Sequence, residues 1–178
     1  MFEFLFGKGK GKAGVSQDQA AAPRAPEPAP GAAPGTAIHF SPDLIDQLKR
    51  DHQTLLGLFA ALREAFAAGN HTAVAEHLET FRIAIQSHLL VENIRLYIYL
   101  EHQLSGDAGS HELIHGFRHE MDAIGKAVMA FIAKYKDIAV DHNLAASFGK
   151  DADAVGRVLV DRIKREEATL YPLYLPVY

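Results

Sequence analysis

Apolar residues recur every three or four positions in four long stretches of the chain, which is the spacing of one face of an α-helix. The four stripes consist of Ile45, Leu48, Leu55, Phe59, Leu62 and Phe66; of Val74, Leu78, Phe81 and Ile85; of Phe117, Met121, Ile124, Val128, Phe131 and Tyr135; and of Phe148, Ala152, Val155, Leu159 and Leu170. Stretches of about 25–30 residues joined by short loops are typical of an antiparallel up-down four-helix bundle. No stretch alternates apolar and polar residues over the length of a strand, so the sequence predicts an all-α fold.

The ends of the first two helices carry recognisable capping residues. Ser41 followed by Pro42 predicts the start of the first helix, because serine is a favourable N-cap and proline fits the first turn. Gly69 predicts its end, since glycine tolerates the left-handed backbone that follows many helices. Asn70 can then cap the second helix, which the pattern extends over residues 71–103.

The later boundaries are set by a polar loop and by proline. Residues 105–109, SGDAG, predict a loop, and Ser110 is the expected N-cap of a third helix that runs to about residue 136. The fourth helix is expected to begin between residues 141 and 147 and to end at Pro172. The last residues, PLYLPVY, predict a non-helical tail that packs on the end of the bundle.

Two segments of different composition precede the bundle, which is expected over residues 37–178. Residues 13–36 are rich in Ala, Pro and Gly and lack large apolar side chains, so they predict an extended, disordered linker. Residues 1–12, MFEFLFGKGKGK, combine an apolar tip with spaced lysines. This tip is either a start without a role or a weak contact for a membrane surface or partner, because phenylalanine enters the interface and lysine favours anionic headgroups.

Composition changes this picture mainly by what it excludes. The 178 residues contain no Cys, so a metal would need nitrogen and oxygen ligands, for which 10 histidines are available. With a net charge of −4 and no basic block, the chain is not expected to bind nucleic acid. Polar residues interrupt every apolar stretch before it reaches the roughly 20 residues of a transmembrane span. The lysines follow the apolar tip, whereas a secretory signal would place them first, which predicts a cytoplasmic protein.

Five polar residues occupy positions where the helical stripes would normally carry apolar side chains. They are His52 in the first helix, His88 and Glu92 in the second, and Arg162 and Glu166 in the fourth. Burying an isolated carboxylate is costly unless it is paired, hydrogen-bonded or bound to a metal. Polar side chains that meet in a bundle core from several helices are typical of a metal site, and two His with two Glu suit Fe(II) or Zn(II).

Arg162 allows a second interpretation, in which no metal is bound. Its guanidinium could bridge Glu92 and Glu166 and supply the positive charge itself. The core would then hold an ion-pair network, whose desolvation cost favours a role in specificity over one in stability.

At these residues the chain resembles the hemerythrin-like (HHE) family. That family carries a His on its first helix, His-x3-Glu on the second, a His on the third, and His-x3-Glu on the fourth, followed by an acidic residue and an L-[FY]-P ending. The motifs RDHQTLL around His52, HLLVE from His88 to Glu92, and EEATLYP from Glu166 fit the first, second and fourth helices, over residues 41–172. The resemblance implies a bundle that binds non-haem iron, two ions in the complete form, and that handles O2, responds to NO or repairs iron sites.

The resemblance is incomplete at two ligand positions. Arg162 stands where the fourth helix should carry His, and a guanidinium stays protonated and cannot bind a metal. On the third helix the apolar stripe places Met121, or else Phe117 or Arg118, at the position of the expected His. Both missing imidazoles would serve the same one of the two irons, so the resemblance implies at most one well-held ion.

Other histidines of the third helix are near in sequence but out of phase. His111, His115 and His119 share a face that points away from the apolar stripe and is expected to be solvated, with a surface site for Zn, Ni or Cu as the alternative. His115 and His119 could reach the core only if Gly116 broke the helix. The ligands that the resemblance implies are His52, His88, Glu92 and Glu166.

A single iron with an open coordination position could take O2 or NO, and the resemblance therefore implies a sensor or a carrier. No nucleophile or acid–base pair indicates turnover, so the sequence predicts a protein that is not an enzyme. A second and weaker resemblance is to the sigma-binding regulators of bacterial RNA polymerase, through Arg162-Ile-Lys-Arg-Glu166-Glu167. It implies a metal-free bundle whose exposed surface binds a protein partner such as a sigma factor.

Five further side chains carry expectations of their own. Glu167 is expected to face away from Glu166 and into solvent. The rims of the core are expected to contain four tyrosines whose hydroxyl groups reach water: Tyr97, Tyr99, Tyr171 and Tyr174. For Tyr97 or Tyr171 the alternative is a redox role beside a metal.

Overall fold

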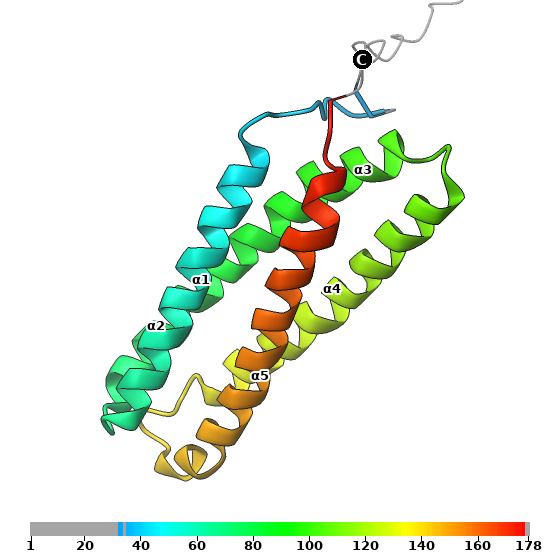
Figure 1. Cartoon of the computed structure of the whole chain (residues 1–178). Helices are drawn as coiled ribbons and strands as arrows, with labels where there is room; N and C mark the ends of the chain where they lie inside the picture. The colour runs from blue at the N-terminus through cyan, green and yellow to red at the C-terminus, as the bar shows by residue number, and fades with distance from the viewer. Residues whose placement is uncertain (1–31, 34, 177–178) are drawn as a thin grey trace, which may run out of the picture.

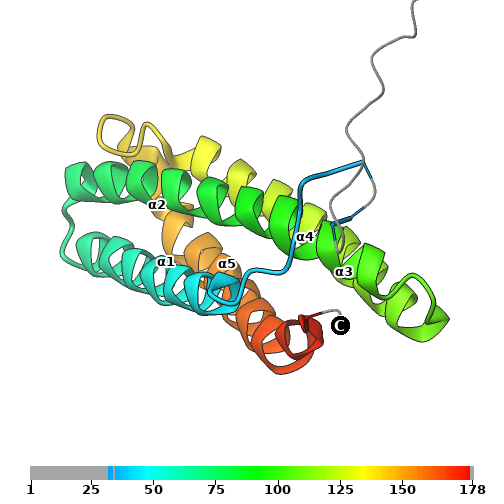
Figure 2. The same cartoon turned by 90° about the horizontal axis from the view of Figure 1, so that it is seen from above.

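The computed structural model describes residues 32, 33 and 35–176, and within them the chain forms a bundle of four helical rods. The rods run alternately up and down (Figure 1), and both this view and the view from above in Figure 2 show them side by side. They consist of α1 (Leu44–Ala67); of α2 (His71–Val91), the π-helical segment η1 (Glu92–Tyr97) and α3 (Ile98–Gln103); of α4 (Ala108–Tyr135); and of α5 (Ala145–Arg165) with the π-helical segment η3 (Glu166–Leu170). The described part contains no strand. The predicted all-α antiparallel bundle is thus confirmed.

The ends of α1 and α2 follow the sequence signals with one shift. The helix begins at Leu44 after Asp43, two residues later than Ser41 and Pro42 indicate. Gly69 has a φ of +71°, so it takes the left-handed conformation that ends α1. The side chain of Asn70 accepts a hydrogen bond from the backbone of Ala73 and caps α2, as predicted.

The expected N-cap of α4 was wrong by three residues. Asp107 caps this helix, and its Oδ2 atom accepts a hydrogen bond from the backbone N–H of Ser110, because the loop that ends at Asp107 is already extended there. A 3-10 turn, η2 (His142–Leu144), leads into α5. Pro172 does end the fourth rod, although it lies inside a last 3-10 turn, η4 (Tyr171–Leu173), which makes the tail less irregular than expected.

The segment before α1 closes over the end of the bundle that contains α3. The backbone N–H of Ala33 donates to the carbonyl of Ile38, and Ala32 and Ala33 are buried. The ring of Phe40 stacks on Tyr174, whose hydroxyl accepts from the backbone N–H of Ser41. The predictions for residues 1–12 and for residues 13–31 fall outside the described residues.

Two apolar clusters fill the core, one at each end of the bundle. The cluster near the α1–α2 turn includes Leu55, Phe59 and Phe81, and the cluster at the α3 end includes Leu48 and Leu96. His52 is one turn from both Leu48 and Leu55, so it lies at the boundary between the clusters. None of the helices in the described part combines the length and apolar character needed to cross a bilayer.

Candidate metal centre

A layer of polar side chains separates the two apolar clusters. Among the described residues, the buried polar or charged side chains are those of His52, His88, Glu92, Arg162 and Glu166, none more than 3% exposed. These are the five residues that the helical phase predicted. They come from three of the four rods, so the bundle itself brings them together. We call this set the polar layer.

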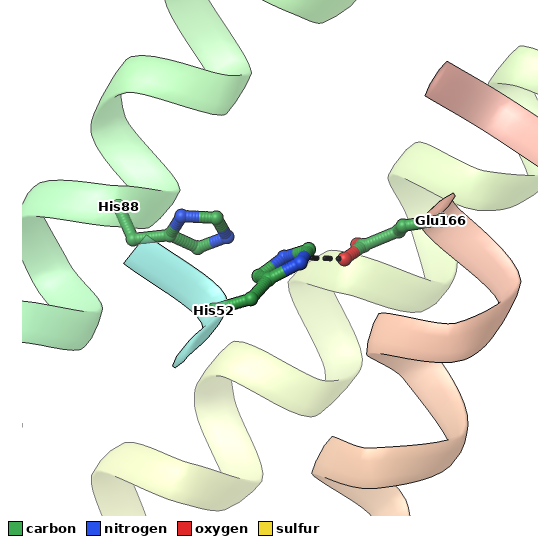
Figure 3. Close-up of side chains that lie close together, drawn as sticks. All are labelled: His52, His88 and Glu166. Carbon is green, nitrogen blue, oxygen red and sulfur yellow. Dashed lines mark ion pairs between the residues drawn. The ribbon is translucent and has the colours of Figure 1, made fainter. Parts of the chain in front are cut away.

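Three members of the polar layer form a compact donor cluster. His52, His88 and Glu166 each offer a nitrogen or oxygen atom, and these atoms lie within 4.8 Å of one another. Nε2 of His52 is 3.2 Å from Oε2 of Glu166, and the two imidazole rings are 4.8 Å apart between centroids. Figure 3 shows the three side chains converging from α1, α2 and the fourth rod. Donors that converge in this way between helices could hold a small cation.

Glu92 lies next to this cluster and is only partly satisfied. Its Oε2 atom is 3.9 Å from Nε2 of His88 and has no hydrogen-bond partner. Its Oε1 atom accepts a hydrogen bond of 3.2 Å from the hydroxyl of Tyr171. Burial, followed by the negative charge of Glu166, raises the pKa of Glu92 well above its ordinary value. A buried carboxyl oxygen without a partner is costly, and a cation nearby would satisfy it.

His52 is held in one orientation by Glu167. Its Nδ1 atom lies 2.8 Å from Oε1 of Glu167, whose side chain was expected in solvent and is 37% exposed while it makes this contact. Burial lowers the pKa of His52, but the hydrogen bonds to Glu166 and Glu167 outweigh it and raise the pKa above its ordinary value. A carboxylate behind one ring nitrogen, with the other nitrogen facing the site, is the usual support of a metal-binding histidine.

His88 presents a neutral imidazole to the cluster. Burial and the neighbouring charge of His52 lower the pKa of His88 to about 4. Its Nδ1 atom has no hydrogen bond, since the nearest carboxylate oxygen, Oδ2 of Asp51, is 3.8 Å away. A neutral ring keeps the lone pair that a metal needs.

Arg162 binds the oxygen of Glu166 that does not contact His52. Its Nε atom donates to Oε1 of Glu166 at 2.5 Å, Nη1 donates to Glu120 at 3.0 Å, and Nη2 donates to the hydroxyl of Tyr97 at 2.6 Å. Arg162 was predicted to bridge Glu92 and Glu166. The contact with Glu166 is present, but the second carboxylate is that of Glu120 on α4 and not that of Glu92. Since Arg162 occupies Oε1, only Oε2 of Glu166 faces the two histidines.

The third helix contributes no imidazole to the polar layer. Met121 is buried at the inward position, whereas His115 and His119 are exposed on the opposite face, as their phase predicted. Gly116 lies within the unbroken helix α4, so it does not turn either histidine inward.

Each glutamate of the polar layer begins a π-helical segment. A π turn closes hydrogen bonds from i to i+5, so residues five apart stack on the same face. Tyr97 follows Glu92 by five residues and Tyr171 follows Glu166 by five, and both rings are buried beside the layer. The expectation that these tyrosines lie at wet rims was wrong, because both rings are buried where the π turns place them.

A small apolar cavity adjoins the donor cluster on the side away from the tyrosines. Its volume is about 20 Å³, enough for a molecule the size of water or of a diatomic gas. His52, His88, Arg162 and Glu166 form its polar wall. The remaining lining residues are mostly apolar: Leu55, Ile85, Leu89, Met121, Ile124, Gly125, Val128, Leu159 and Ile163.

These observations fit one cation and do not fit two. The donor cluster supplies two nitrogens and one oxygen, and the free Oε2 of Glu92 lies beside it. A second ion would find the other oxygen of Glu166 already bound by Nε of Arg162. The third helix also lacks the imidazole that a second ion would require.

The comparisons with known proteins agree with this geometry. The model of the hemerythrin HHE cation binding domain matches residues 43–174, which covers all four rods and every residue of the polar layer. Neither a curated protein nor a solved structure matches the chain. Because the match spans most of the chain and its fold and buried donors agree with it, the chain belongs to the hemerythrin HHE cation-binding family.

Proposed function

We propose that the chain binds one non-haem iron ion in the polar layer and uses it to bind O2 or NO, as a sensor or carrier. The observation that carries this proposal is the donor cluster of His52, His88 and Glu166, three buried ligand atoms within 4.8 Å of one another. Glu92 completes the proposed ligand set that the family pattern implied. An iron centre supplies a Lewis-acidic, redox-active position for a diatomic ligand.

Residues around the proposed site orient the metal ligands and exclude water. Glu167 fixes the ring of His52, and Arg162 fixes the carboxylate of Glu166, so neither ligand needs to reorganise when the ion binds. The cavity of about 20 Å³ admits only a small molecule beside the cluster. Its apolar lining favours an uncharged diatomic gas over a hydrated anion.

Metal analysis of the untagged protein tests this proposal. We expect about one iron per chain, since the donor cluster offers ligands for a single ion. His88→Ala should lose this iron, and His119→Ala should keep it, because His119 is exposed on the far face of α4. Addition of NO to the ferrous protein should change its visible spectrum. Iron that is absent from the wild type, or that persists in His88→Ala, would contradict the proposal.

A second candidate function is a metal-free regulator that binds a protein partner such as a sigma factor. Arg162 favours it, because this guanidinium already neutralises Glu166 and satisfies Glu120 and Tyr97 without any ion. The same metal analysis separates the two candidates. A wild type without iron, together with an Arg162→His variant that binds iron, would favour the regulator.

A further inference from the structure

The hydroxyl group of Tyr171 lies inside the polar layer. Its oxygen is 3.1 Å from Nε2 of His52 and 3.2 Å from Oε1 of Glu92. The ring is 3% exposed and lies nearly parallel to the ring of His52, with an interplanar angle of 10°. The phenol is thus fixed against a predicted metal ligand and is shielded from solvent.

The spacing around His52 is compatible with ligands that share one ion. Its Nε2 atom has two oxygen neighbours, Oε2 of Glu166 at 3.2 Å and the hydroxyl oxygen of Tyr171 at 3.1 Å. Two ligands at bond lengths of about 2.0–2.2 Å from one metal lie roughly 3.0 Å apart at a right angle and roughly 3.4 Å apart at a tetrahedral angle. Both separations fall within this range. A hydrogen bond alone would also permit them, so the chemistry of the oxygen has to decide.

Tyr97 shows what distinguishes Tyr171. It holds the equivalent position, five residues after Glu92, but its hydroxyl accepts a hydrogen bond of 2.6 Å from Nη2 of Arg162. A permanent guanidinium at that oxygen keeps a second cation away. Tyr171 has no permanently charged partner, since its oxygen contacts an imidazole nitrogen, which can lose its proton, and a carboxyl oxygen. Of this pair of tyrosines, Tyr171 alone is therefore free to coordinate.

We propose that Tyr171 is a further ligand of the ion, and that its oxygen coordinates as phenolate when the iron is ferric. This inference rests on the proposed function, because it requires iron at the donor cluster. When the ion binds, the O–H bond of Tyr171 breaks, its electron pair forms the oxygen–iron bond, and the proton leaves to solvent. No electron is transferred in this step. Phenolate oxygen is a hard anionic donor and suits the ferric ion.

Visible spectroscopy on the full chain tests the assignment. The untagged protein is loaded with ferrous iron without oxygen and then oxidised with ferricyanide, and its iron content is measured. Phenolate bound to ferric iron gives a charge-transfer band in the visible region, and resonance Raman excitation in this band selects tyrosine ring vibrations. We expect the band in the wild type and in Tyr97→Phe, and its loss in Tyr171→Phe with iron retained.

The outcomes separate this inference from the proposal on which it rests. A wild type that binds no iron would overturn both. Iron without tyrosine vibrations, or a band that persists in Tyr171→Phe, would overturn the assignment of Tyr171 alone. If Tyr171→Phe fails to hold iron, the Raman spectra of the wild type and of Tyr97→Phe decide which tyrosine is the ligand, since Tyr97 is the other phenol in contact with the polar layer. Tyrosine vibrations in both would support Tyr171 as the ligand.

Discussion

The Nε atom of Arg162 lies 2.5 Å from Oε1 of Glu166, so a permanent cation binds the carboxylate whose other oxygen faces His52. This contact divides Glu166 between two roles. One oxygen is neutralised by the protein, and the other remains for an ion. With an arginine at a family ligand position, the bundle thus still has Oε2 of Glu166 beside the two histidines, where the three donors could hold a metal.

Replacement of Arg162 by Met should destabilise the metal-free protein. The change leaves Glu166 buried without its cation, and breaking a buried ion pair from one side costs about 3–5 kcal/mol. Urea unfolding measures this loss. Arg165→Met is the matched control, because Arg165 also binds Glu120 but is 44% exposed, and its loss should cost less than about 1 kcal/mol. Equal stability of Arg162→Met and the wild type would show that the ion pair is dispensable.

Replacement of Glu167 by Gln should weaken iron binding without unfolding the bundle. The change removes the negative charge behind Nδ1 of His52, and such supporting groups are worth about 10–100-fold in metal affinity. Competition with a chelator measures the affinity. Glu112→Gln, an exposed change on α4, is the control and should leave it unaltered. An unchanged affinity in Glu167→Gln would mean that the hydrogen bond to His52 has no part in metal binding.

The stability of the metal-free protein should fall with acid through His88. Its pKa is lowered to about 4 in the folded state, whereas an unfolded chain binds this proton at the ordinary value of about 6.5. As the pH falls from 6.5 towards 4, His88 binds a proton in the unfolded state but not in the folded state. The contribution of His88 to stability is present above this window and is lost across it, by up to about 1.4 kcal/mol per pH unit.

Urea unfolding between about pH 7 and pH 5 measures this slope, and comparison with His88→Gln isolates it. The variant lacks the titrating group, so its stability should fall less steeply with acid than that of the wild type. His119→Gln is the control and should keep the wild-type slope, because this residue is exposed. Parallel curves for the wild type and His88→Gln would refute the assignment.

Filling the apolar cavity should reduce gas binding and leave iron binding intact. Val128 lines the cavity of about 20 Å³, and Val128→Ile adds one methylene that competes for this space. One methylene in a tight pocket changes binding by roughly 1–3 kcal/mol, so NO affinity should fall by about tenfold or more. Val140→Ile is the control, since Val140 is 79% exposed. NO titration and iron content are the two readouts, and unchanged NO affinity would place the gas elsewhere.

The apolar pattern predicted the bundle and the five residues of the polar layer because the α-helical spacing of inward-facing residues continues as far as Glu92 and Glu166. From Val74 to Glu92, steps of three and four residues keep one face inward, and the same holds from Phe148 to Glu166. Within this regular part, the placement of His52 at the core and of His119 outside it follows from phase alone.

The remainder of the site depends on the π turns, which the apolar pattern does not encode. Beyond each glutamate the change to i→i+5 spacing places Tyr97 and Tyr171 against the polar layer. Glu167 contacts His52 from the start of the second π turn. The shared pattern of Glu, four residues and Tyr in ENIRLY and EEATLY was the one available signal. Helical phase also could not predict that the guanidinium of Arg162 turns towards Glu120, because Glu120 lies on α4, a helix without a polar core position.

The guanidinium of Arg162 has a consequence for how the protein matures. Since its charge is present at every physiological pH, a newly made chain carries its own counter-charge for Glu166 before any ion binds. Formation of the bundle therefore does not have to wait for a cation to neutralise this carboxylate. On the proposal that the chain binds iron, scarcity of iron would change whether the site is filled and not whether the bundle folds.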